Sequence, residues 1–446
     1  MSRYYLMAIR YFLFVGCALM LLILQGCQRA ELGSGAVSTS LGQVPAVRLN
    51  YRYEADVPPP TEPVKAQSEE RNAAVQNDFD QNRPDEVLDK TIASPDGKRT
   101  VAVYHRVNDL PSEFRLDMYG ADGKPLQKMT SDLMAAHFPD TIRWSPDSAN
   151  VAFVAMVRGV QTEPETEGQQ PPVPPSLSNS NSNVTSNIDP EANAATDVNS
   201  NTNFEAPVSE PTPIAPTGIL TFRTEQIYLA NANGEGVRPV TQNEGLIYFY
   251  YAWAPDGSAL AALASTQREW QYLQFRAESN GEIFVPVGRP RVVEKNGRER
   301  RLDDALTAVH PVWSPDSAKV AAAYDTQVRV YDAGGTTPTQ AAIPLKNQLL
   351  ISSQAYDREQ QQKLEAANTG VDTNQTTANT NQPASTLPDE KSLVSYNPIV
   401  SLAWTADELL YFQTAFIKRM KKEADSVMSF PRWHRLVLTP QAAPAR

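Results

Sequence analysis

Short apolar runs recur in pairs along the chain, and a polar turn of similar composition separates the two members of each pair. In one pair the first run ends at Trp144, the turn reads Ser-Pro-Asp-Ser, and the second run spans 151–154. Two extended apolar segments joined by a tight turn are typical of a β-hairpin. The second runs lie at 101–104, 151–154, 260–263, 320–323 and 409–412. The pattern therefore predicts five hairpins of one kind.

The turns share one short motif: an aromatic or apolar residue, then a small residue, then usually a proline, then an aspartate. Proline presets the backbone for the turn, and the aspartate side chain accepts hydrogen bonds from nearby backbone amides. We therefore expect these aspartates to be structural and not a row of ligands. The repeated positions are Asp96, Trp144, Asp147, Trp253, Asp256, Trp313, Asp316, Trp404 and Asp407.

A third strand with an Asp-Gly or Asn-Gly type of exit follows several hairpins, at 115–123, 226–234 and more loosely 328–335. Fourth strands are expected at 127–130 and 238–241. A four-stranded antiparallel unit of this kind is a propeller blade. One such sheet cannot bury both of its faces alone, whereas a closed ring of them can. The fold class expected is all-β, a β-propeller with five recognisable blades and five to six in total.

The repeated Trp-Ser-Pro-Asp-Gly phrase resembles the repeat of TolB-type, WD40-like β-propellers over roughly 88–440. Two copies depart from the pattern, because Ala93 replaces tryptophan in the first and Ala406 replaces proline in the last. The family usually has six blades. The last blade offers three strands, so we expect its fourth from 46–53, which would pair the two ends of the chain.

Two insertions interrupt the repeats, at about 161–217 and 354–391. Both are rich in Asn, Ser, Thr, Gln and Pro. Such polar segments bury too little apolar surface to offset the entropy lost on ordering. We expect both to be disordered, with the first leaving between the second and third strands of its blade.

The N-terminal segment reads as a secretion signal, with Arg3 and Arg10 before an apolar stretch at 11–24. The phrase that ends at Cys27 resembles the bacterial lipobox, which implies removal of 1–26 and lipid attachment to Cys27. An uncleaved membrane anchor is the alternative. Gln28 after the cysteine favours an outer-membrane protein facing the periplasm. A tether over 27–87 would join the lipid anchor to the propeller, and a short tail, 441–446, would follow it.

Charge narrows the partners. The formal net charge is −11, so nucleic acid is not expected as a partner. Two segments are locally basic, 289–301 around an Asn-Gly turn and 418–422. Either one is a candidate contact for lipid phosphate or an acidic partner, or else a solvated hairpin tip. The candidate binding residues in the first are Arg298, Arg300 and Arg301.

Catalytic motifs are sparse. The sequence has no Gly-x-Ser-x-Gly phrase, and its four histidines lack the spacing of metal ligands, so neither a cofactor nor a metal is expected. His137 and His310 each precede the tryptophan of a blade and are candidates for the central channel.

These observations give three functional hypotheses. The leading one is a non-enzymatic, lipid-anchored module that binds an envelope protein or polymer through one face of the ring. The alternative is a propeller enzyme acting on polysaccharide or peptide, with carboxylates and His137 or His310 at the channel. The third is an envelope sensor or assembly factor.

Overall fold

The computed structural model describes residues 41–61, 71–157, 225–369 and 387–441. The expected signal peptide, Cys27, the insertion at 161–217 and nearly all of the tail lie outside the described residues.

The described residues form five antiparallel sheets, which confirms the all-β, propeller-type fold. The first contains β2 (Glu86–Ala93), β3 (Arg99–Arg106), β4 (Arg115–Gly120) and β5 (Pro125–Lys128). The second contains β6 (Met134–His137) and β7 (Arg143–Trp144), both paired with β8 (Asn150–Val157), then β9 (Gln226–Asn231) and β10 (Arg238–Pro239). The third contains β11 (Leu246–Trp253), β12 (Ala259–Thr266), β13 (Arg289–Glu294) and β14 (Glu299–Arg301). The fourth contains β15 (Val312–Trp313), β16 (Lys319–Tyr324), β17 (Gln327–Asp332) and β18 (Gln340–Pro344).

The fifth sheet joins the two ends of the described chain. It contains β19 (Ile399–Ala406), β20 (Leu409–Lys418) and β21 (Val427–Pro440), and its outer strand is β1 (Leu49–Glu54). Strand β1 runs antiparallel to β21, with Leu49 opposite Pro440 and Glu54 opposite Arg435. The pairing is the one expected for segment 46–53, with the strand itself starting three residues later.

The repeated phrase forms a contact between neighbouring sheets. In three copies the tryptophan Nε1 donates to a backbone oxygen of the preceding sheet: Trp144 to Ile92 at 3.1 Å, Trp253 to Arg143 at 3.2 Å and Trp313 to Ala252 at 3.0 Å. In four copies the aspartate side chain accepts from a backbone amide of its own turn, as Asp147 does from Ala149 at 3.0 Å. Trp404 differs, because its Nε1 donates to Asp407 in its own hairpin at 3.3 Å.

Apolar side chains fill each junction between consecutive sheets. Leu116 of the first sheet and Phe153 of the second share one cluster, and Leu229 and Tyr248 share the next. The third and fourth sheets meet around Trp313. The fourth and fifth meet in a cluster containing Val328, Val330, Leu410 and Leu436.

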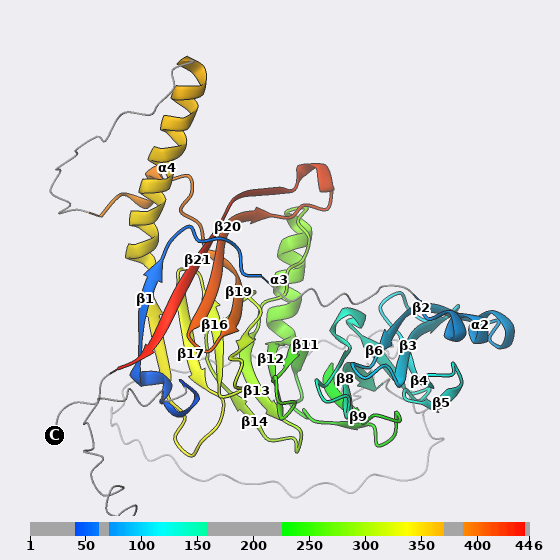
Figure 1. The fold of residues 1–446 in the computed structure, drawn as a ribbon. Coiled ribbons are helices and arrows are strands. Elements are labelled where there is room, and N and C mark those ends of the chain that lie inside the picture. Colours follow the sequence, from blue (N-terminus) through cyan, green and yellow to red (C-terminus); the bar gives the residue numbers. More distant parts are fainter. Residues whose placement is uncertain (1–40, 62–70, 158–224, 370–386, 442–446) are drawn as a thin grey trace, which may run out of the picture.

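The five sheets lie in a row whose two ends remain apart (Figure 1). No apolar cluster of the described residues joins the first sheet to the fifth. The closed ring that the repeats suggested is therefore not seen here. Among the described residues, the outer face of the first sheet packs against α2 and shares no apolar cluster with another sheet.

Two helices occupy segments for which the sequence predicted no regular structure. Helix α2 (Ala73–Asn82) lies in the expected tether, where Asn72 caps it by accepting from the amides of Ala74 and Val75 at 3.0 and 3.2 Å. Helix α4 (Lys346–Thr369) extends into the expected insertion at 354–391. Its N-terminal part is tied to the core by Leu349, which is buried.

A third helix, α3 (Gln267–Ser279), follows β12 and begins with a capping box made by Thr266 and Glu269. None of the helices in the described part of the chain is long and apolar enough to cross a membrane.

Candidate functional site

The two candidate channel histidines have different neighbours in the structure. His137 ends β6, and its Nδ1 lies 3.3 Å from Glu225. His310 stacks on Tyr250 of the third sheet with 3.7 Å between ring centroids, and desolvation there lowers the pKa of His310. Each histidine thus contacts its own neighbours, and a shared role at the channel stays a prediction.

The three arginines of the basic hairpin lie in β13–β14 and the turn between them. Arg298 faces Glu294 at 3.7 Å, and Arg301 pairs with Asp304 at 2.9 Å. Arg300 donates to the backbone oxygen of Asp332 in the fourth sheet, and burial lowers the pKa of Arg300. Of the three, only Arg300 joins the third sheet to the fourth, while Arg298 and Arg301 make exposed ion pairs close by in the chain.

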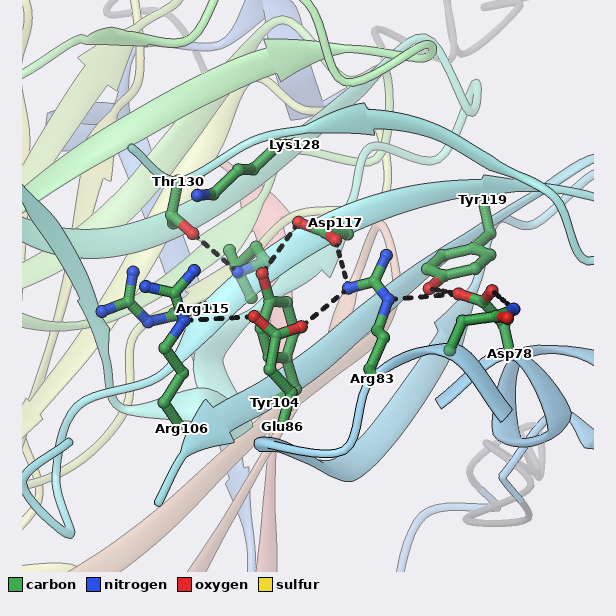
Figure 2. Close-up of polar contacts among 12 residues, drawn as sticks. Asp78, Arg83, Glu86, Tyr104, Arg106, Arg115, Asp117, Tyr119, Lys128 and Thr130 are labelled. Carbon is green, nitrogen blue, oxygen red and sulfur yellow. Dashed lines mark hydrogen bonds and ion pairs between the residues drawn. The ribbon is translucent and has the colours of Figure 1, made fainter. Parts of the chain in front are cut away.

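A cleft of about 470 Å³ opens instead on the outer face of the first sheet. Figure 2 shows the polar side chains that converge there. The residues that line it come from β2 to β5 and from the segment after α2: Arg83, Glu86, Tyr104, Asp117, Pro125, Leu126, Gln127 and Lys128.

Strand alternation places these side chains on one face. Successive residues of β4 point to opposite faces, so Leu116 and Met118 pack toward the second sheet while Asp117 and Tyr119 point outward. Lys128 of β5 lies opposite Asp117. Helix α2 covers part of this outer face with Val75 and Phe79, which are buried against Tyr104 and Tyr119 of the sheet.

Arg83 is the centre of the cluster. Its Nη1 donates to Asp117 at 2.7 Å and to Glu86 at 3.1 Å, and its Nε donates to Asp78 at 3.1 Å. The guanidinium also lies 4.5 Å from the ring centroid of Phe79, a favourable cation–π contact. One cation thus holds three carboxylates, two of which line the cleft.

Further ion pairs surround this cluster. Glu86 also accepts from Arg106 Nε at 3.1 Å, and Arg106 reaches Asp132 at 3.2 Å. Asp132 is in turn 3.0 Å from Lys128 Nζ and 3.3 Å from Arg115. The cleft therefore has cationic groups on both sides of its carboxylates (Figure 2).

Burial sets Asp117 apart from the other carboxylates of the cluster. Desolvation raises the pKa of Asp117 even though Arg83 and the Tyr104 hydroxyl, 3.2 Å away, both favour its charged form. At Asp78 burial also acts to raise the pKa, but hydrogen bonds from Asn82, Tyr119 and Arg83 outweigh it, and the pKa is lowered. The cleft thus holds a carboxyl that keeps its proton to a higher pH than usual.

Sequence reasoning missed this site. Glu86 and Arg83 lie in the segment expected to be a tether, and the repeat predicts Asp117 only as one position of a third strand. A usable signal was present, since Asp117 interrupts the apolar residues Leu116 and Met118 in a strand that is buried along its whole length. Within the described ranges, no group of three or more His, Cys, Asp or Glu side chains is arranged to hold a metal ion.

No protein-family model matches the sequence, and no curated protein is significantly similar to it. Among solved structures, an oligogalacturonate lyase in complex with manganese is similar at 12% identity, covering 80% of this chain and 66% of that one, with a TM-score of 0.34. Prolyl oligopeptidase B from Galerina marginata is 9% identical over 77% of this chain and 35% of that one, with a TM-score of 0.35. The tricorn protease is 10% identical over 79% of this chain and 27% of its own, with a TM-score of 0.28.

These structures are enzymes, and the comparison contradicts the prediction of a non-enzymatic binding module. The likeness concerns the fold, and this chain spans no more than about two thirds of the proteins it resembles. The chemistry of the chain is therefore argued from its own cleft.

Proposed function

We propose that the chain is an enzyme that cleaves glycosidic bonds in a polysaccharide at the cleft of the first sheet. The observation that carries the proposal is Asp117, a buried carboxyl of raised pKa beside a second carboxylate, Glu86. Glycoside cleavage needs such a pair, one group to protonate the leaving oxygen and one to act on water or on the sugar. A volume of about 470 Å³ lies within the range of small-ligand sites.

The contacts give each group a role. Asp117 in its protonated form would donate to the glycosidic oxygen, and Glu86 would serve as the base or nucleophile. Arg83 holds both carboxylates through one nitrogen, so it would stabilise the charge that Asp117 acquires when its proton leaves. The Tyr104 hydroxyl orients Asp117 from the buried side.

The lining residues also favour polysaccharide over peptide as the substrate. Peptide cleavage by acyl transfer needs a hydroxyl or thiol nucleophile with an adjacent base. None of the residues that line the cleft is a serine, threonine or cysteine. The cations around the cleft, Arg106 and Lys128 among them, suit a polymer with acidic substituents.

The test is depolymerisation of a panel of neutral and acidic polysaccharides by the purified full chain. New reducing ends would report cleavage, and ultraviolet absorbance of an unsaturated sugar would separate elimination from hydrolysis. Asp117→Asn and Glu86→Gln keep side-chain size and should each lower kcat at least 100-fold, since acid–base groups contribute on that order. Asp122→Asn, on an exposed turn of the same sheet, is the matched control.

An unchanged kcat in both cleft variants, with folding verified by circular dichroism, would remove the cleft from the mechanism. No cleavage of any polymer by the unmodified chain would count against the proposal as a whole.

We propose separately that the enzyme is a lipoprotein of the cell envelope, attached through Cys27 and facing the periplasm. The support is the lipobox-like phrase and the apolar segment before it. Metabolic labelling with an alkyne fatty acid should mark the chain, and Cys27→Ser should abolish the label. Equal labelling of both would refute lipid attachment at this residue.

A further inference from the structure

Strands β20 and β21 continue beyond the sheet to which they belong. The pairing of β19 with β20 ends at Thr414, and the pairing of β1 with β21 ends at Arg435. Farther out the two strands pair only with each other, with Phe416 opposite Ser429 and Lys418 opposite Val427. We call residues 416–430 the projecting ribbon.

The tip of the projecting ribbon rests on the end of α3. Lys421 N donates to the Gly281 oxygen at 2.9 Å, and Ile283 N donates to the Arg419 oxygen at 3.0 Å. Lys421 Nζ lies 3.1 Å from Glu278. In Figure 1 the ribbon, α3 and α4 all extend from the same side of the row of sheets, and η2 (Ala46–Arg48) lies toward the other side. The tip of the ribbon is thus held in place by these contacts.

The projecting ribbon presents large apolar side chains to solvent. Met428 is 58% exposed, and Phe275 of the supporting helix is 71% exposed. The exposed apolar residues of the ribbon and its support are Phe416, Ile417, Val427, Met428, Phe430, Tyr272, Phe275 and Ile283. Neighbouring exposed apolar side chains in this number mark an interaction surface.

Cations concentrate at the same tip. Lys418, Arg419, Lys421 and Lys422 are all exposed, and within the described structure only Lys421 has an ion pair with an acidic side chain. Glu423 and Asp425 lie at the same tip, so residues 416–430 carry four positive and two negative charges, a net +2 against −11 for the whole chain. Exposed apolar side chains next to lysine and arginine are the combination that binds the surface of an anionic bilayer.

We infer that the projecting ribbon docks on an anionic lipid bilayer. Its apolar side chains would enter the boundary between headgroups and acyl chains, and its cations would contact lipid phosphates. A bilayer is the partner that this combination of exposed apolar side chains and exposed cations favours. This surface goes beyond the proposed catalytic role, which lies in the first sheet at the other end of the row.

The test is a fluorophore that reports polarity at one position of the full chain. Both native cysteines are replaced by serine, and an environment-sensitive thiol probe is attached at Met428→Cys or, as control, at Val47→Cys, which is 58% exposed near the foot of β1. Vesicles are phosphatidylcholine alone or mixed with phosphatidylglycerol, with brominated lipid as quencher. The apolar N-terminal segment is present in both proteins, so any attachment through it affects them equally.

We expect a blue shift and quenching at position 428 on anionic vesicles, little change at position 47, and at least a tenfold weaker response for Lys418→Glu with Lys422→Glu. Lys98→Glu with Lys124→Glu, on exposed turns of the first sheet, makes the same charge change away from the ribbon and should have no effect. Equal signals at 428 and 47, or a shift that depends on protein concentration without vesicles, would overturn the inference; the second result would indicate a second copy as the partner.

Discussion

The two faces of the first sheet are built from alternate residues of the same strands, yet they differ completely in character. The face toward the second sheet is apolar, with Val103, Leu116 and Met118 fully buried. The opposite face carries Asp117 and Tyr119 with Arg83 across them. The difference shows that strand alternation lets one sheet carry an apolar face toward its neighbour and a charged face with a cleft on the other side.

The repeated tryptophans also differ between sheets. Each of three tryptophans bonds to the sheet before it. In the first sheet, which only β1 precedes among the described strands, Ala93 stands at that position. Trp404 in the fifth sheet bonds only within its own turn, where the motif has lost its proline. The motif therefore joins successive sheets, and the copies that depart from it lie in the first and fifth sheets.

The largest effect is expected at a junction between sheets. Trp313→Ala removes a buried ring and its bond to Ala252, and should lower the free energy of unfolding by about 4 kcal/mol. Trp404→Ala is the matched control, because it removes the same side chain without a bond to another sheet, and should cost about half as much. Urea denaturation measures both. Equal losses would show that the contact between sheets is not the source of the difference.

The next effect is expected on the charged face. Arg83→Met removes the cation from buried Asp117 and should destabilise the protein by about 3 kcal/mol. Adding Asp117→Asn should restore part of that loss, because the uncompensated buried charge is gone. A double variant as unstable as the sum of the two single variants would mean that the pair is not coupled.

A smaller effect, dependent on pH, is expected at His434 in the fifth sheet. His434 is fully buried between Tyr53, at 2.9 Å, and Thr414, at 3.1 Å, and burial lowers its pKa to about 4. The stability that depends on neutral His434 is therefore present above pH 6.5 and is lost as pH falls toward 4.

Between pH 7 and pH 5 the loss should be about 2 kcal/mol, measured by urea denaturation at each pH. His434→Gln cannot take up the proton and should show a flatter profile. The nearby Asp56–Arg432 pair is present in both proteins and so cancels in the comparison. Parallel profiles for the two proteins would assign the pH dependence to other groups.

The smallest effect is expected for an exposed ion pair between the first two sheets. Lys90 lies 2.7 Å from Asp140, whose side chain is almost wholly exposed. A double-mutant cycle with Lys90→Ala and Asp140→Ala should give a coupling energy of about 0.5 kcal/mol or less, and less still at high salt. A coupling energy above about 1 kcal/mol would contradict this expectation.

The sequence by itself determined the repeating unit of this protein. Apolar alternation and the Ser-Pro-Asp turns act over a few residues, so the hairpins followed from local chemistry. The pairing of 46–53 with the last sheet was predicted because that blade otherwise has only three strands. Helix α2 was missed because its stability comes from packing Val75 and Phe79 against the first sheet, and α4 because its N-terminal part is anchored by Leu349.

Only the tertiary structure decided which faces stay uncovered and what they do. Arg83 and Asp117 are 34 residues apart, and they meet because α2 lies across the outer face of the first sheet. The raised pKa of Asp117 comes from burial, which no local pattern reports. The repeat thus specified how neighbouring sheets pack. The cleft lies on the outer face of the first sheet, and the projecting ribbon extends beyond the paired part of the fifth.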